Sequence, residues 1–195
     1  MFFEQNQLMG GLSILELLKV HTQEVHKSLE AGSFMSNFLK DDLNMTRYQE
    51  LLRTIFQVLA PIERAIAESS YLTNFQSVKS RDYFTALKED LSYFGQLDLL
   101  SSHPLPGPEI TSLAQLAGVL YVLEGSALGG RVLEKKIKHK LTIDKNSGLA
   151  YFSAQSELGF NRWPMFKDEI ESLVKENEFQ SCLDSAKLTF GRFKC

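Results

Sequence analysis

The sequence predicts an all-α fold, a single-domain bundle of several helices, and three observations support this prediction. Apolar residues recur at helical spacing in successive segments of the chain. At the start of three of these segments, Ser or Thr is followed three residues later by Glu or Gln, the pattern of a capping box. No segment alternates apolar and polar residues for long enough to indicate a strand. With 195 residues, 44% of them hydrophobic, the chain is long enough to bury one core, and we expect residues 1–195 to form one domain with a flexible N-terminus at 1–11.

The first half of the chain contains three predicted helices. Ser13 and Glu16 cap a helix that reaches about Glu30, and a short apolar segment follows at 33–40. Thr46 and Gln49 are expected to cap a second helix running towards Glu68, with Pro61 inside it as a kink or break. We expect Ser80 to open the third, in which five apolar residues keep helical spacing: Tyr83, Phe84, Leu87, Leu91 and Phe94.

The second half begins after a loop at 101–109, which holds three prolines and a glycine. Ser112 with Gln115 caps a long helix from Leu113 to about Lys138. Residues 142–162 are polar and interrupted by glycine, and are expected to form a connection with some local helix. We expect Pro164 in the first turn of a helix to about Glu176, and a last helix at 179–193.

Charge and composition exclude several classes of function. The net charge is −3 and no large basic face is evident, so nucleic acid is not an expected partner. The N-terminus lacks the pattern of a secretory signal, and no run of 18 apolar residues predicts a membrane span. The two cysteines have no metal-ligand spacing. We therefore expect a soluble cytoplasmic protein. One dense basic cluster fits the solvated C-terminal end of a helix: Lys135, Lys136, Lys138, His139 and Lys140.

The long helix from Leu113 is unusual because it contains four glycines, each costing about 1 kcal/mol relative to alanine. Gly118, Gly125 and Gly129 fall on one face, and Gly130 lies beside it. Two explanations fit this spacing. The bare backbone either packs closely against another helix or faces a flat ligand. Tyr121 and Val122 border this face, and Lys136 lies two turns beyond Gly129.

The first helix carries two histidines at the margins of its core stripe, which comprises Ile14, Leu18, Val25 and Leu29. His21 and His26 lie on opposite margins, and either could be an ordinary, partly exposed polar residue. Lys19 is two turns before His26 on the same face. A neutral imidazole with an ammonium nearby suits a haem, which needs an axial nitrogen for iron and a cation for a propionate. Periodicity alone does not choose between the two histidines.

Two motifs together carry a resemblance to a known family. TQEVHKSLE at 22–30 and LYVLEGSALGGRVL at 120–133 resemble the haem oxygenases, in particular their bacterial branch, and the likeness extends over most of 12–193. The resemblance implies a haem oxygenase-type bundle with His26 as the iron ligand. The glycine motif, which is expected to lie over the oxygen-binding face and to be catalytic, comprises Gly125, Ser126, Gly129 and Gly130. The residues expected to bind the haem are Lys19, Thr22, Tyr121 and Lys136, of which Lys136 rests mainly on its place on the helix.

In one respect the chain departs from the mammalian members of the family. It lacks the aspartate that follows their glycine motif, and Arg131 follows the glycine pair instead. The resemblance then implies that ordered water organises the oxygen, as in bacterial members, and it leaves the proton path open.

The implied reaction is the opening of haem, both substrate and cofactor, with O2 and electrons to give biliverdin, CO and ferrous iron. No glycine-rich nucleotide motif is present, so no tightly bound flavin is expected and a separate ferredoxin or reductase must supply electrons. A bacteriophytochrome is a candidate acceptor of the biliverdin. Two alternatives stay open: a haem carrier or sensor that leaves haem intact, and a thiaminase-like hydrolase, which would need an activated cysteine.

Overall fold

The computed structural model describes residues 11–32, 43–96, 98 and 106–194, and these ranges contain helices and no strand. The described ranges hold six α-helices: α2 (Ile14–Gly32), α4 (Met45–Glu68), α5 (Tyr83–Tyr93), α7 (Leu113–Leu141), α8 (Ala150–Leu173) and α9 (Phe179–Gly191). Three short 3-10 turns are η1 (Ser70–Asn74), η2 (Glu176–Glu178) and η3 (Arg192–Lys194). The prediction of an all-α bundle is confirmed. The predicted segment 33–40, most of the loop at 101–109 and the N-terminus before Gly11 lie outside the described residues.

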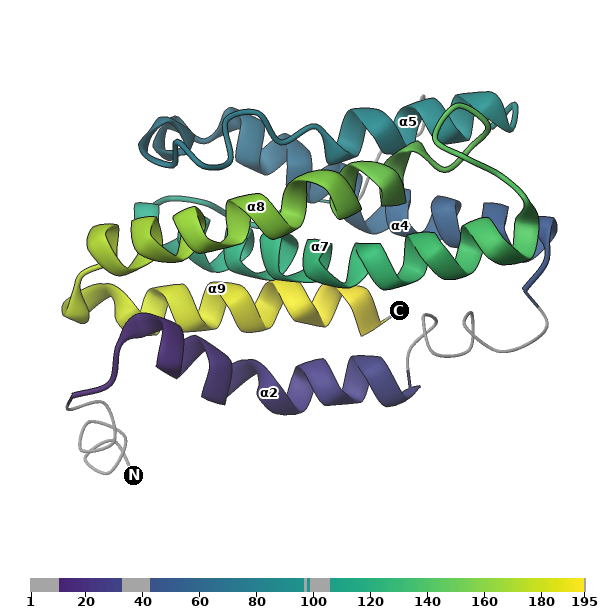
Figure 1. Ribbon diagram of the computed structural model, residues 1–195. Coiled ribbons are helices and arrows are strands. Elements are labelled where there is room, and N and C mark those ends of the chain that lie inside the picture. The colour runs from purple at the N-terminus through teal and green to yellow at the C-terminus, as the bar shows by residue number, and fades with distance from the viewer. Residues whose placement is uncertain (1–10, 33–42, 97, 99–105, 195) are drawn as a thin grey trace.

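Helix α7 runs through the middle of the bundle (Figure 1). It packs along α8 on one side and along α9 on another, while α2 packs against α9 and α8. Helix α5 packs on α4 and α8, so α4 and α5 form an upper layer in this view. Helices α2, α7 and α9 run in the same direction and α8 runs in the opposite one (Figure 1).

Local capping explains where two of the helices begin. The Ser13 hydroxyl accepts from the Glu16 amide at 3.3 Å while the Glu16 carboxylate accepts from the Ser13 amide at 2.9 Å, so the predicted capping box of α2 is confirmed. The Ser112 hydroxyl accepts from the amide of Gln115 at 3.2 Å and caps α7 as predicted.

Two predicted helix starts were wrong by about two residues. Helix α4 is capped by Asn44, whose side chain accepts from the Arg47 amide at 3.1 Å, and Thr46 lies inside its first turn. Asparagine is as good an N-cap as threonine, and it comes first in the chain. Helix α5 begins after Asp82, not at Ser80. Pro61 does not break α4, which is continuous from Met45 to Glu68.

The prediction for 142–162 was also wrong, because α8 is one continuous helix from Ala150, with Pro164 in its interior and not in a first turn. Its N-terminus is capped from another helix. The carboxylate of Asp90 on α5 accepts from the amides of Ala150 at 2.7 Å and Tyr151 at 2.9 Å. Asp90 is 60 residues away from Ala150 in the sequence, so no local sequence pattern could predict this cap.

Helix α7 is long and apolar enough, by length and composition alone, to cross a membrane. Of its most apolar 18-residue window, 56% is buried inside the bundle, as in the core helix of a folded domain. The predicted basic cluster follows this buried part. Lys138, His139 and Lys140 occupy the last turn of α7, where cations are favoured by the helix dipole. The cytoplasmic location stays a prediction.

Candidate functional site

The side chains of Thr22 and Tyr121 lie close to each other, where α2 approaches α7. Thr22 is 4% exposed, and its hydroxyl donates to the carbonyl of Leu18 at 2.6 Å. Burial raises the pKa of Tyr121, and the nearby Thr22 side chain opposes that rise. This contact relates positions along α2 to positions along α7.

The Thr22–Tyr121 contact sets the level of the predicted iron ligand against the glycine motif. His26 comes four residues after Thr22, and Gly125 comes four residues after Tyr121. Because α2 and α7 run in the same direction, both residues lie about 6 Å further along their helices, at a rise of 1.5 Å per residue (Figure 1). The structure therefore brings an imidazole and a stretch of bare backbone to corresponding levels.

Helix α9 covers the glycine face of α7 only in part. A Cβ atom on Gly118 would clash with the backbone of Cys182, and it would lie 2.9 Å from the amide nitrogen of Ala186. Here close helix packing is the correct explanation for the missing side chain. Since α9 runs with α7 and ends at Gly191, five residues after Ala186, it stops about one and a half turns past Gly118.

Beyond the end of α9, the described residues leave the glycine face open. Among them, a Cβ atom on Gly129 would meet nothing within 4 Å, and one on Gly125 would touch only the ring of Trp163, at 3.7 Å. Gly130 differs, because it is buried against Gln155 on α8. The hydroxyl of Ser126 donates to the carbonyl of Leu123 at 2.7 Å. Of the four predicted motif residues, Gly125 and Gly129 thus present bare backbone on this side.

His26 lies beside the end of α9. Its ring is exposed and meets Phe190 edge to face, with centroids 5.9 Å apart. The side chain of Glu30, a candidate to orient the imidazole, lies outside the described residues. His21 has other neighbours on α9, Asp184 and Lys187. Burial and the Lys187 ammonium lower the pKa of His21, and Asp184 opposes them.

Aromatic side chains of α8 border the open glycine face. The ring of Trp163 lies 5.7 Å from that of Tyr121 and contacts the position of Gly125. Phe160, one turn earlier on α8, is 69% exposed. The sequence analysis did not single out Phe160, because it assigned 142–162 to a connection. The i, i+3 spacing of Phe160 and Trp163 was the signal that could have found it.

The α7 surface around Gly129 is apolar and exposed. Leu128 and Val132 share the face of Gly125 and Gly129 at helical spacing, and they are 38% and 69% exposed. An exposed apolar surface of this kind, with the His26 imidazole at a corresponding level of α2, suits a flat apolar ligand.

The two predicted propionate-binding lysines lie at opposite ends of this region. Lys19 is exposed and comes three residues before Thr22, whereas Lys136 is half-buried and comes fifteen residues after Tyr121. Eighteen residue rises separate their levels by about 27 Å. The two propionates of haem share one edge, so a single haem cannot use both lysines. Lys19, near the level of Tyr121, and Lys136 therefore mark two alternative positions for the propionates of the haem.

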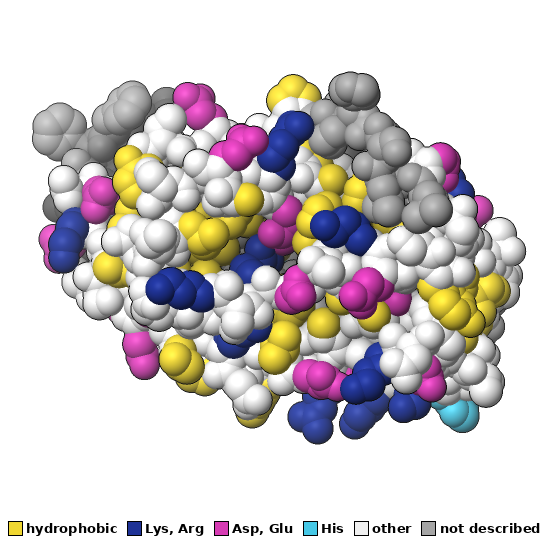
Figure 2. Space-filling view, turned by 90° about the horizontal axis from the view of Figure 1, so that it is seen from above, with side chains coloured by type: hydrophobic (Ala, Val, Ile, Leu, Met, Phe, Trp, Pro, Cys, Tyr) yellow, Lys and Arg dark blue, Asp and Glu magenta, His cyan; other side chains and the backbone are white. Residues whose placement is uncertain are grey.

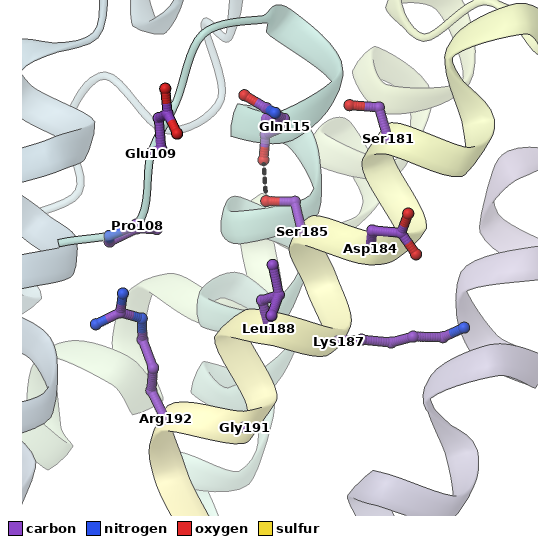
Figure 3. Close-up of a pocket in the computed structure, with 10 residues that line it drawn as sticks. All are labelled: Pro108, Glu109, Gln115, Ser181, Asp184, Ser185, Lys187, Leu188, Gly191 and Arg192. Atoms are coloured by element: carbon purple, nitrogen blue, oxygen red, sulfur yellow. Dashed lines mark hydrogen bonds between the residues drawn. The ribbon is translucent and has the colours of Figure 1, made fainter.

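A pocket of about 660 Å³ lies elsewhere, on the outer side of α9, and none of the predicted site residues lines it (Figure 3). Leu188 and Ser185 lie at its centre, with Arg192 and Pro108 on its rim. Two acidic side chains, of Glu109 and Asp184, and two basic ones, of Lys187 and Arg192, line it without converging on one point. The pocket is separate from the glycine face of α7.

Comparisons with known proteins find similarity in sequence and in fold. Residues 12–104 match the family model described as heme oxygenase, a range that includes Lys19, Thr22 and His26 and ends before α7. A curated protein named heme oxygenase, from Xanthomonas campestris pv. campestris (strain 8004), is 32% identical over 93 residues. That match covers 48% of this chain and 54% of the relative, so it spans about half the length of the curated protein.

The fold extends the likeness to the rest of the chain. The structure is similar to the NO- and CO-bound heme oxygenase from Neisseria meningitidis, with a TM-score of 0.72 and 18% sequence identity. This match covers 94% of the present chain and 89% of the Neisseria chain, and it therefore includes the glycine helix that the family model does not reach. Residues 12–104 are thus similar to haem oxygenases in sequence, and the fold of the chain is similar to that of a haem oxygenase.

Proposed function

We propose that the chain is a haem oxygenase that binds haem between α2 and α7 and opens it with O2 and external electrons to biliverdin, CO and ferrous iron. The observation that carries the proposal is the Thr22–Tyr121 contact between two helices that run in the same direction. One turn beyond it, His26 and Gly125 come to the same level on the two helices.

The residues around this level fit a haem. Gly125, Gly129, Leu128 and Val132 offer a flat, apolar and partly exposed surface, which suits one face of a porphyrin. His26 offers an exposed imidazole for the iron. Lys19, next to the buried Thr22, offers an ammonium for a propionate at the Tyr121 end.

When bound, haem supplies the redox chemistry and the ring that is cleaved. His26 would hold the iron through an imidazole nitrogen, which lacks the electron-donating push of a thiolate. The missing side chains at Gly125 and Gly129 leave space for a small gas molecule. Ser126 keeps its lone pairs free to accept from an ordered water, because its own proton goes to the Leu123 carbonyl.

Electrons come from a separate ferredoxin or reductase in this proposal. The basic residues at the C-terminal end of α7 offer a surface to an acidic donor. A bacteriophytochrome is one class of acceptor for the biliverdin.

Haem titration followed by reduction tests the proposal. Purified protein should bind hemin at one equivalent with a Soret spectrum of a histidine-ligated haem. Adding ascorbate, or a ferredoxin system, in air should then remove the Soret band and yield biliverdin. A stable Soret band under these conditions would instead support a haem carrier, and no stoichiometric complex would exclude both functions.

A further inference from the structure

Five polar side chains, buried or half-buried, converge behind α7, on the side away from the glycine face. They come from α4, from the start of α5, from α7 and from α8: Glu63, Arg81, Tyr83, Glu124 and Arg162. Arg81 joins two of these elements, because its guanidinium donates to Glu63 at 2.6 Å and to Glu124 at 2.8 Å. Arg162 donates to the backbone carbonyl of Ser80 and to its hydroxyl.

Among the described residues, three buried atoms of this cluster have no hydrogen-bond partner: the Tyr83 hydroxyl, Oε2 of Glu124 and Nη1 of Arg162. Both arginines lie beside the ring of Tyr83, since the guanidinium carbons of Arg81 and Arg162 lie 5.6 Å and 5.5 Å from its centroid. Burial and then the Glu124 carboxylate raise the pKa of Tyr83 to about 12. The hydroxyl and Oε2 of Glu124 are thus near each other, but not in hydrogen-bond geometry. Buried polar atoms rarely stay without a partner, because desolvating them costs free energy.

The charges of the cluster indicate a neutral occupant. Two guanidinium groups, of Arg81 and Arg162, balance the two carboxylates of Glu63 and Glu124, and Tyr83 is neutral at physiological pH. An added ion would leave one charge uncompensated in a buried site. A water molecule adds none, and it can accept from Arg162 while it donates to Glu124. Three protein partners is also the usual number for a buried water.

Solvent has a route to the cluster. A pocket of about 310 Å³ lies between α4 and the start of α5, and its lining includes Glu63, Arg81 and Tyr83. Figure 2 looks onto this side of the molecule and shows a hollow in which basic and acidic side chains lie below the surrounding surface.

We propose that Tyr83, Glu124 and Arg162 form a buried binding site for ordered water, which is filled through this pocket. The site ties α5 and α8 to α7 at Glu124, the residue directly before Gly125. It stands independently of the haem chemistry.

Whether Tyr83→Phe lowers or raises the stability of the protein tests the proposal. If water bridges the hydroxyl, its removal deprives the water of a partner and lowers the folding equilibrium constant about tenfold. If the hydroxyl is buried dry, its removal relieves an unsatisfied group, and stability stays equal or rises. Tyr48→Phe is the matched control, because the Tyr48 hydroxyl is also buried and donates directly to the Gly148 carbonyl at 2.8 Å. Denaturant unfolding of the full chain should show a loss of stability for both Tyr83→Phe and Tyr48→Phe.

A crystal structure of the full chain that resolves ordered water gives the second readout. We expect a water within about 3.2 Å of all three atoms in the unaltered protein. An unchanged or higher stability of Tyr83→Phe would overturn the proposal. So would direct pairing of the Tyr83 hydroxyl with Glu124, or density for an ion at the site.

Discussion

The indole ring of Trp163 lies against Gly125, 3.7 Å from the place where a Cβ atom would stand. Trp163 is the only tryptophan of the chain, and its ring also lies 5.7 Å from that of Tyr121. A single fluorophore therefore borders the face on which haem is proposed to bind.

Trp163 fluorescence should report haem binding directly. Haem is an efficient acceptor of excitation energy at short range, so one equivalent of hemin should quench most of the emission. A fluorescence titration measures this, with free tryptophan amide as the control for inner-filter loss and hemin absorbance as the measure of binding. Full binding by absorbance without quenching would contradict the proposed position of haem next to α8.

Gly129→Leu should separate folding from ligand binding. No atom of the described residues lies within 4 Å of the added Cβ, so the variant should fold with equal stability or gain up to about 1 kcal/mol from better helix propensity. Its affinity for hemin should fall at least tenfold, because the side chain occupies the ligand's place. Denaturant unfolding and hemin titration give the two values.

Gly118→Ala is the matched variant on the same helix. Its methyl group would press on the backbone of α9 at Cys182, so the free energy of unfolding should fall by about 1–3 kcal/mol. Turnover that survives in Gly129→Leu would contradict the close-approach explanation of the open face.

His26→Ala should remove the spectrum of axial histidine ligation and most of the turnover. His21 lies beside Asp184 and Lys187 instead, so His21→Ala should keep both. Absorption spectra of the ferric complexes, with imidazole added to rescue His26→Ala, make the measurement. The opposite pattern would assign the iron to His21.

Lys19→Ala should weaken hemin binding or change which biliverdin isomer forms, because loss of the propionate contact lets the haem rotate in its plane. Lys136→Ala should leave the isomer unchanged, since Lys136 lies about 27 Å further along the site. Chromatography of the biliverdin isomers distinguishes the two variants. If only Lys136→Ala changed the biliverdin isomer, the propionates would have to lie at the C-terminal end of α7 instead.

Asp90 should make stability depend on pH between about 4 and 6. Burial raises its pKa from 3.8 to about 6, although the amides of Tyr151 and Ala150 oppose that rise. The folded chain thus holds this proton more tightly than the unfolded chain does. The stabilising contribution is complete below pH 3.8 and is lost as the pH rises to about 6.

Asp90→Asn isolates this effect, because asparagine does not titrate. The free energy of unfolding of both proteins is measured in denaturant from pH 4 to 7. As the pH rises, the unaltered chain should lose stability relative to the variant. A difference that is constant over this range would contradict the raised pKa.

The sequence predicted those parts of the fold that depend on local chemistry. Ser13 and Ser112 cap their own helices, so α2 and α7 could be found from spacing alone. Helix α8 could not, because its first amides are capped by Asp90 on α5. Pro164 adds to the difficulty, as it removes one hydrogen bond inside α8. The affected turn includes the exposed Phe160, where water can satisfy the freed carbonyl.

The candidate site was predictable in its residues and not in its arrangement. Periodicity placed three glycines on one face, but only the position of α9 distinguishes Gly118 from Gly129. The level of His26 against Gly125 required the Thr22–Tyr121 contact, which joins residues 99 positions apart in the sequence.

The end of α9 at Gly191 divides the glycine face of α7 into two parts that are under different steric constraints. Before that point, an added methyl group would clash with the protein itself. After it, the methyl group would be tolerated until a ligand binds. Relatives that had lost the catalytic role would therefore be free to vary at Gly129 while remaining constrained at Gly118.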